Sequence, residues 1–87
     1  MDKLAVVRQW LSDGFSASEI DTMSFDLFHE IYGDIESVNL KSAKIQHLVD
    51  WCFQNGKMFE LGQYMVRTNP NQARRYIQMY GQGVFNG

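Results

Sequence analysis

The chain has 87 residues, 45% hydrophobic and 14% aromatic, which is enough for one small domain with a single core and excludes a second domain. Its formal net charge of −2 argues against broad nucleic-acid binding, which needs clustered Lys and Arg to neutralise phosphates. The single cysteine, Cys52, excludes an internal disulfide, and the absence of a long apolar run argues against membrane insertion or secretion, so we expect a cytoplasmic protein.

Apolar residues at helical spacing begin close to the N-terminus and predict a first helix from Asp2, as its cap, to about Ser12. The apolar positions of this helix are Leu4, Val7 and Leu11 on one face, with Trp10 beside them. We expect Gly14 to end the helix, because glycine tolerates the conformation that a helix C-terminus usually needs.

A second helical region follows, with Ser16 or Ser18 as its cap. Its apolar residues are crowded: Ile20, Met23, Phe25, Leu27, Phe28 and Ile31. The region reaches residues 32–33 either as one helix or, with a break near Ser24, as two short helices, and the pattern leaves both open. Residues 34–39 are predicted to form a loop that Ile35 and Val38 pin to the core.

A long helix is predicted next, capped by Asn39 or Ser42 and ended at Asn55 by Gly56. Its core-facing stripe spans an arc of about 100°. The stripe consists of Ile45, Leu48, Val49 and Cys52. A buried free thiol is common in such a position.

Two further helices complete the pattern, over residues 58–68 and from Pro70 to about Tyr80. The first carries a stripe of Met58, Leu61, Tyr64, Met65 and Thr68, and the second carries Ala73, Ile77 and Tyr80. Asn69, Pro70 and Gln72 have the pattern of a cap, a first-turn proline and half a capping box. Since no alternating strand pattern is present, we predict an all-α, compact bundle of five or six short helices over residues 1–80, with a flexible C-terminal tail over residues 81–87.

Charge is divided along the chain. Residues 13–40 contain seven acidic residues and no Lys or Arg, whereas residues 41–87 contain six basic residues and two acidic ones. One interpretation is that these are ordinary solvated helix faces with pairing inside the molecule. The other is that an acidic patch of one copy meets a basic patch of another.

Several short segments, taken in order, resemble the bacterial effector-associated domains, also described as bacterial death-like domains. They are Phe25-Asp26-Leu27-Phe28, Ile31-Tyr32, Lys44-Ile45, Leu48-Val49, Trp51-Cys52, Asn55-Gly56, Leu61 and Asn69-Pro70. The resemblance covers roughly residues 15–76. It implies a death-fold-like bundle that is a non-catalytic adaptor in bacterial immunity. Such a domain pairs with itself or with like domains on effector proteases or sensors, with filament formation as one outcome. The chain fits both a stand-alone adaptor and a domain of a longer protein.

Two sets of charged residues are the predicted interface of this adaptor. The acidic set is Asp21, Asp26, Glu30, Asp34 and Glu36; the basic set is Lys41, Lys44, Lys57, Arg67, Arg74 and Arg75. Trp51 is the candidate aromatic contact, because it lies beside the apolar stripe and large aromatics dominate binding energies when desolvated. Phe59 and Val66 lie off the stripe of their helix, and we expect a second buried side to cover them.

Other kinds of site find less support. His47 and Cys52 are five residues apart, about 140° around a helix, so they do not form a nucleophilic pair. Two histidines and one cysteine lack the spacing of a structural zinc site, so we expect no metal, cofactor or catalytic residue. The alternative function is a regulatory domain that binds nucleic acid through Arg67, Arg74 and Arg75, with Tyr76 and Tyr80 stacking on bases.

Overall fold

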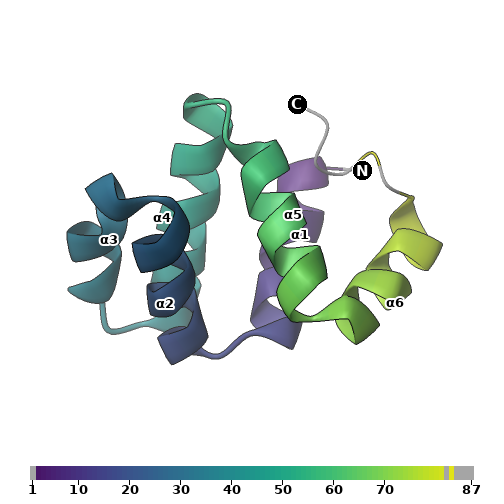
Figure 1. Ribbon diagram of the computed structural model, residues 1–87, viewed down its shortest axis with the longest axis horizontal. Helices are drawn as coiled ribbons and strands as arrows, with labels where there is room; N and C mark the ends of the chain where they lie inside the picture. Colours follow the sequence, from purple (N-terminus) through teal and green to yellow (C-terminus); the bar gives the residue numbers. More distant parts are fainter. Residues whose placement is uncertain (1, 82, 84–87) are drawn as a thin grey trace.

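Six α-helices make up most of the computed structural model, which describes residues 2–81 and 83 (Figure 1). They are α1 Lys3–Gly14, α2 Ala17–Leu27, α3 His29–Glu36, α4 Lys41–Gln54, α5 Met58–Thr68 and α6 Pro70–Tyr80. No strand occurs in these described residues, and the predicted all-α bundle is confirmed. Of the tail predicted over residues 81–87, residues 82 and 84–87 lie outside the described residues.

Side-chain caps start three of the helices, as their sequences predict. Asp2 accepts a hydrogen bond from a first-turn N–H of α1, at 3.0 Å. Ser16 and Glu19 form a complete capping box at α2, in which each side chain accepts from the other's backbone N–H. At α6, Asn69 Oδ1 accepts from the backbone N–H of Gln72, and a proline occupies the first turn. These bonds satisfy N–H groups that a helix start leaves without intrahelical partners.

The second helical region is divided into α2 and α3, which was one of the two arrangements that its sequence allows. The division falls at Phe28 and not near Ser24. Ser24 is buried within α2, where its Oγ donates to the carbonyl of Ile20 at 2.9 Å. This bond keeps the hydroxyl satisfied without a break in the helix.

The loop before α4 is shorter than predicted, because α3 continues to Glu36. Leu40 is the N-cap residue of α4 and makes no side-chain cap, so the prediction that Asn39 or Ser42 caps this helix is wrong. The end of α4 follows the prediction: Gly56 has a φ of 68° just beyond it, in the left-handed region that glycine adopts without strain.

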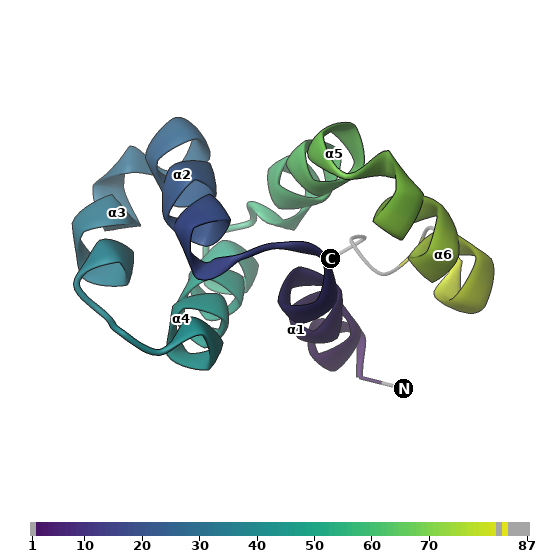
Figure 2. The same ribbon diagram turned by 90° about the horizontal axis from the view of Figure 1, so that it is seen from below.

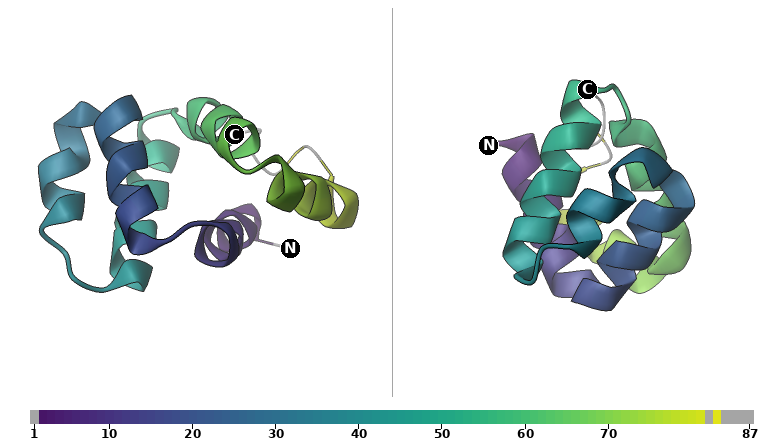
Figure 3. Two further views of the ribbon diagram at one scale, coloured as in Figure 1. Left: turned by 60° about the horizontal axis from the view of Figure 1, so that its bottom comes forward. Right: turned by 90° about the vertical axis from the view of Figure 1, so that its left-hand side faces the viewer.

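One cluster of buried side chains joins all six helices. α4 is central and packs against α1, α2, α3 and α5, while α6 packs against α5 and α1 (Figures 2 and 3). The predicted stripe of α4 lies in this cluster: Ile45, Leu48, Val49 and Cys52 are buried. The largest side chain in the core is that of Trp10, which is fully buried.

The outer faces of α5 and α6 differ from the sequence prediction. Phe59 is 59% exposed and Val66 is 39% exposed, so the expected second buried side of α5 is wrong. The core holds only the face that carries Leu61 and Met65, since one side of α5 is enough to close a bundle of this size. Thr68 is exposed as well, and the tyrosine that α6 buries is residue 76, not residue 80.

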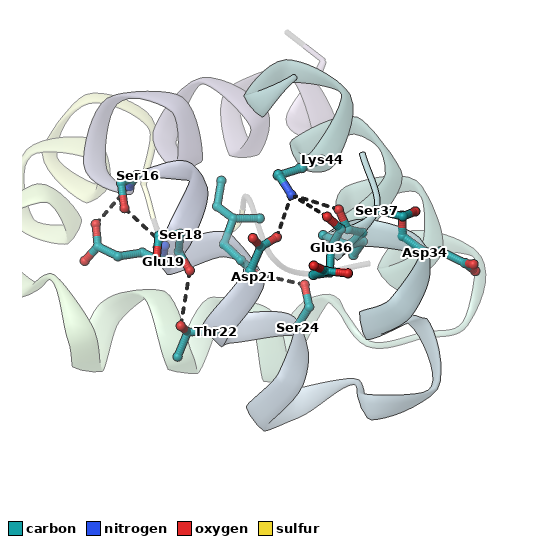
Figure 4. A network of polar contacts seen from close by, with 12 residues as sticks. Ser16, Ser18, Glu19, Asp21, Thr22, Ser24, Asp34, Glu36, Ser37 and Lys44 are labelled. Atoms are coloured by element: carbon teal, nitrogen blue, oxygen red, sulfur yellow. Dashed lines mark hydrogen bonds and ion pairs between the residues drawn. The ribbon is translucent and has the colours of Figure 1, made fainter. Parts of the chain in front are cut away.

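A buried lysine joins three helices in the core. Lys44, on α4, is 4% exposed, and its Nζ donates to Asp21 Oδ1 on α2 at 2.8 Å (Figure 4). The same ammonium donates to the backbone carbonyls of Ile35 at 2.9 Å and Glu36 at 3.4 Å, at the end of α3. Lys44 thus satisfies all three of its donors, and it places a positive charge at the negative end of the α3 dipole.

Replacing Lys44 with methionine tests this contact. Lys44→Met keeps most of the side-chain volume but leaves Asp21 and two backbone carbonyls without the ammonium. We expect the free energy of unfolding, measured by urea denaturation, to fall by about 3 kcal/mol. The control Lys57→Met changes an exposed lysine and should stay within about 0.5 kcal/mol of the wild type. Equal stability of the two variants would contradict a structural role for Lys44.

Candidate interaction surfaces

The acidic set separates into three environments. Glu30, Asp34 and Glu36 are exposed on α3. Asp26 is exposed on α2, where its Oδ2 accepts a hydrogen bond from the phenol of a tyrosine on α5 at 3.1 Å. Asp21 is partly buried in the ion pair with the core lysine. Three free carboxylates therefore mark α3 as the acidic end of the molecule.

The basic set is scattered over the fold. Arg74 and Arg75 are exposed on α6, and Lys57 is exposed in the turn before α5. Lys41 is half-buried at the start of α4, where its Nζ donates to the carbonyl of Ser12 at 2.7 Å. Arg74 and Arg75 are therefore two exposed cations next to each other in sequence, and we name α6 the basic end.

Lys44 and Asp21 belong to neither end. Their charges face each other inside one molecule, and the lysine is buried. A partner could reach this ammonium only if the contact between α2, α3 and α4 opened. Lys44 is therefore removed from the proposed basic surface, and Asp21 is removed from the acidic one.

The two ends lie far apart. In Figures 1 and 2, α3 is at one end of the long axis and α6 is at the other. The molecule measures 34 × 23 × 21 Å along its principal axes. No Lys or Arg occurs in residues 13–40, and no Asp or Glu occurs in residues 61–87. The helix α3 therefore carries only acidic charges and α6 only basic ones, and the carboxylate of Asp13 on α1 lies against α6.

Between the ends, charges are combined within the chain. The guanidinium of Arg67 lies over the ring of Tyr64, 5.5 Å from its centroid, and the phenol of Tyr64 donates to Asp26. Burial, and then the bond to Asp26, raise the pKa of Tyr64 above its usual value. Arg67 and Asp26, one from each set, thus meet around one ring, so this face has no single sign of charge.

Polar and aromatic contacts hold α6 against α1. The phenol of Tyr76 donates to Asp13 Oδ2 at 2.5 Å, and its ring stacks on that of Trp10 with centroids 5.1 Å apart. Asn69 Nδ2 also donates to the carbonyl of Gly14 at 2.8 Å. A Cβ at Gly14 would lie 3.0 Å from an α6 side-chain atom, so glycine permits this close approach. These contacts fix the direction in which α6 presents its arginines.

Trp51, the predicted aromatic contact, is half-buried. Its ring packs against that of Phe28, with centroids 5.2 Å apart, at the margin of the core. Sequence reasoning did not single out a cluster at the corner of α2 and α3, where the rings of Phe25, His29 and Tyr32 contact one another. Their spacing of four and then three residues was the available signal, but it runs across the break at Phe28.

The groups considered for chemistry are separated or buried. Cys52 lies in the core, where burial, and then the nearby charge of Glu60, raise the pKa of its thiol to about 12. A thiol with this pKa is protonated near neutral pH and is a poor nucleophile. Within the described range, no group of three or more His, Cys, Asp or Glu residues is placed to hold a metal ion. That range also contains no helix long and apolar enough to cross a membrane.

Six short helices around one core, with α3 and α6 at the two ends, define a small all-α domain. The sequence model described as Effector-associated domain 7 matches residues 7–70, more than half of the chain. The chain therefore belongs to this family, and the resemblance to effector-associated domains is confirmed. Such domains are adaptor-like and non-catalytic, and they associate with effector proteins of conflict systems. No curated protein and no solved structure matches the chain.

From the environment of the Tyr76 phenol, we predict that the free energy of unfolding falls at alkaline pH. Burial, and then the bond to Asp13, raise the pKa of Tyr76 from 10.0 to about 12. Between these values the unfolded chain ionises this phenol first, so its contribution is complete below pH 10 and is lost as the pH rises through about 12. We expect the wild type to lose about 2 kcal/mol more over this window than Tyr76→Phe in denaturant unfolding.

The difference between the two proteins isolates this phenol, since Cys52 titrates in both. Tyr80→Phe keeps the Tyr76 phenol and its bond to Asp13, so it should retain most of the wild-type loss over this window; the charge of Tyr80 is a smaller cause of the raised pKa of Tyr76. A Tyr76→Phe profile parallel to that of the wild type would contradict the assignment.

Proposed function

We propose that this effector-associated domain is an adaptor that self-associates head to tail, with α3 of one copy against α6 of the next. The observation that carries this proposal is the placement of Glu30, Asp34 and Glu36 at one end of the long axis and of Arg74 and Arg75 at the other. Complementary surfaces of this kind steer encounter and set the register of a complex. The acidic and basic ends of one copy lie too far apart to pair with each other, so each end is available to another copy.

The distance between the ends supports an open arrangement. The long axis of 34 Å is several times the Debye length of about 8 Å at physiological salt, so salt screens the attraction between the two ends of one molecule and leaves each end available to another copy. A head-to-tail contact uses a different surface of each copy and leaves one free end of each kind. Copies then add to the chain, and a filament forms unless the rotation between copies closes a ring.

Recruitment follows from the free ends. An effector protease or a sensor that carries a like domain can add to either end, so several effectors are held close together in a bacterial defence system. Their local concentration then rises without any new contact between the effectors. We place this assembly in the cytoplasm, where the lone Cys52 stays reduced. We also propose that the bundle is death-fold-like, as the resemblance to effector-associated domains implies.

Charge-altered variants test the direction of association. The basic-end variant Arg74→Glu/Arg75→Glu keeps its acidic end, and the acidic-end variant Glu30→Lys/Asp34→Lys/Glu36→Lys keeps its basic end. In sedimentation at low salt, we expect the wild type to grow beyond a dimer as its concentration rises and each variant alone to stay monomeric. An equimolar mixture should associate, because the intact acidic end of one variant meets the intact basic end of the other and the two reversed ends are also complementary. High salt should weaken each of these complexes.

Lys57→Glu is the matched control, since it reverses a charge in the turn between α4 and α5, away from both ends, and should associate as the wild type does. Circular dichroism of each variant establishes that the helices are kept. A mixture that stays monomeric would contradict head-to-tail pairing, and association that is insensitive to salt would remove its electrostatic basis. If the wild type stays monomeric but shifts duplex DNA at moderate salt, and Arg74→Glu/Arg75→Glu does not, the nucleic-acid alternative holds.

A further inference from the structure

An ordered aromatic cluster is presented to solvent at the corner of α2 and α3. Phe25 is 50% exposed, and its ring makes edge contacts with His29 and Tyr32, at centroid distances of 4.7 and 5.2 Å. His29 Nδ1 lies 3.3 Å from the carbonyl oxygen of Phe25, and the rings of His29 and Tyr32 are stacked with centroids 6.4 Å apart. The three rings support one another, so their exposed faces are held in place.

A carboxylate and an open space adjoin these rings. Glu36 lies one helical turn beyond Tyr32, and Gly33 lies one turn beyond His29, so these four residues share an arc of about 100° on α3. Glu36 and Gly33 are exposed, and a Cβ at Gly33 would meet no atom within 4 Å. We name this set, with Phe25, the aromatic site.

We propose that the aromatic site binds an arginine of α6 from a second copy of the chain. This inference rests on the head-to-tail association proposed above and identifies the contact that gives it specificity. A guanidinium is planar, stacks on an aromatic ring and pairs with a carboxylate at the same time. The aromatic site offers both partners, the rings of Phe25 and Tyr32 and the carboxylate of Glu36. A lysine supplies the charge but not the planar stack.

The composition of α6 matches this site. Arg75 and Met79 are four residues apart on one face of the helix, and Met79 is 63% exposed. A methionine sulfur makes favourable contacts with aromatic ring edges. This face of α6 therefore offers a cation and a thioether to the rings of another copy. Arg74 is exposed next to Arg75, and α6 contains no acidic residue to repel Glu36. The occupant is thus a second copy, whose basic end complements the acidic end in which the site lies.

Gly33 permits a test that leaves the fold intact. Gly33→Gln introduces a side chain into open space and improves helix propensity, so the variant should be at least as stable as the wild type. The same side chain lies where the guanidinium would enter, and we expect self-association at least about tenfold weaker. Gly33→Ala is the matched control, because it makes the same backbone change without filling the site and should associate as the wild type does.

A variant that keeps the positive charges of α6 but not their planar groups distinguishes this inference from the proposed function. Arg74→Lys/Arg75→Lys keeps the charge of the basic end but removes the planar groups, so we expect association to weaken about tenfold. If this variant and Gly33→Gln both associate as the wild type does while Arg74→Glu/Arg75→Glu stays monomeric, the aromatic site is overturned and head-to-tail charge pairing stands. If the wild type does not self-associate at any salt concentration, both are overturned.

A direct readout comes from a complex limited to two copies. Uncharged replacements are used here, so that the two altered ends do not attract each other. Isotope-labelled Arg74→Gln/Arg75→Gln keeps the aromatic site, and unlabelled Glu30→Gln/Asp34→Asn/Glu36→Gln keeps α6. On mixing, the largest amide shifts of the labelled copy should fall at Phe25, Tyr32, Gly33 and Glu36. Shifts confined to the exposed face of α5, at Phe59 and Val66, would place the second copy elsewhere and overturn the aromatic site.

Discussion

The placement of α3 depends on the buried ammonium of Lys44. This helix has eight residues, too few to be stable alone, and it gives only Ile31 and Ile35 to the core. Its last carbonyls accept from Lys44, whose charge is balanced by Asp21 on α2. One contact thus supplies the positive charge that the C-terminus of α3 favours and joins it to two longer helices. Because the tie lies on the inner side, the outer side of α3 is free to carry carboxylates and aromatic rings.

The opposite end of the molecule is built on the same physical basis. α6 buries only Ala73 and Tyr76, so its apolar contribution is small. The stack of Tyr76 on Trp10 and the bond from Tyr76 to Asp13 add directional contacts to that small buried area. Both end helices thus combine few core residues with an inward polar tie, and most of their surface stays in solvent. A short helix held in this way can carry a high density of charge, since most of its positions have no part in the core.

The features that the sequence predicts are those with local causes. The caps at Asp2 and Asn69, and the left-handed Gly56, depend on residues within one turn of one another. The charge division is also visible in the chain order. Chain order puts Lys44 in the basic set, but its burial depends on Asp21, 23 residues earlier, and on carbonyls that are in place only once α3 has formed. The exposure of Phe59 likewise depends on how the helices pack. The positions of α3 and α6 at opposite ends also follow from the packed bundle and not from any local pattern.

The family match covers the acidic end of the molecule but not the arginines of the basic end. The matched residues 7–70 include all of α3 but only the first residue of α6, so the acidic end lies within the matched range and Arg74 and Arg75 lie beyond it. In an isologous contact both copies use the same patch, and a change in it alters both sides at once. A head-to-tail contact divides the roles between two surfaces that can change separately. Specificity for one partner over another can then be adjusted on α6 by charge and by planar groups, while the tie that holds α3 is left unchanged.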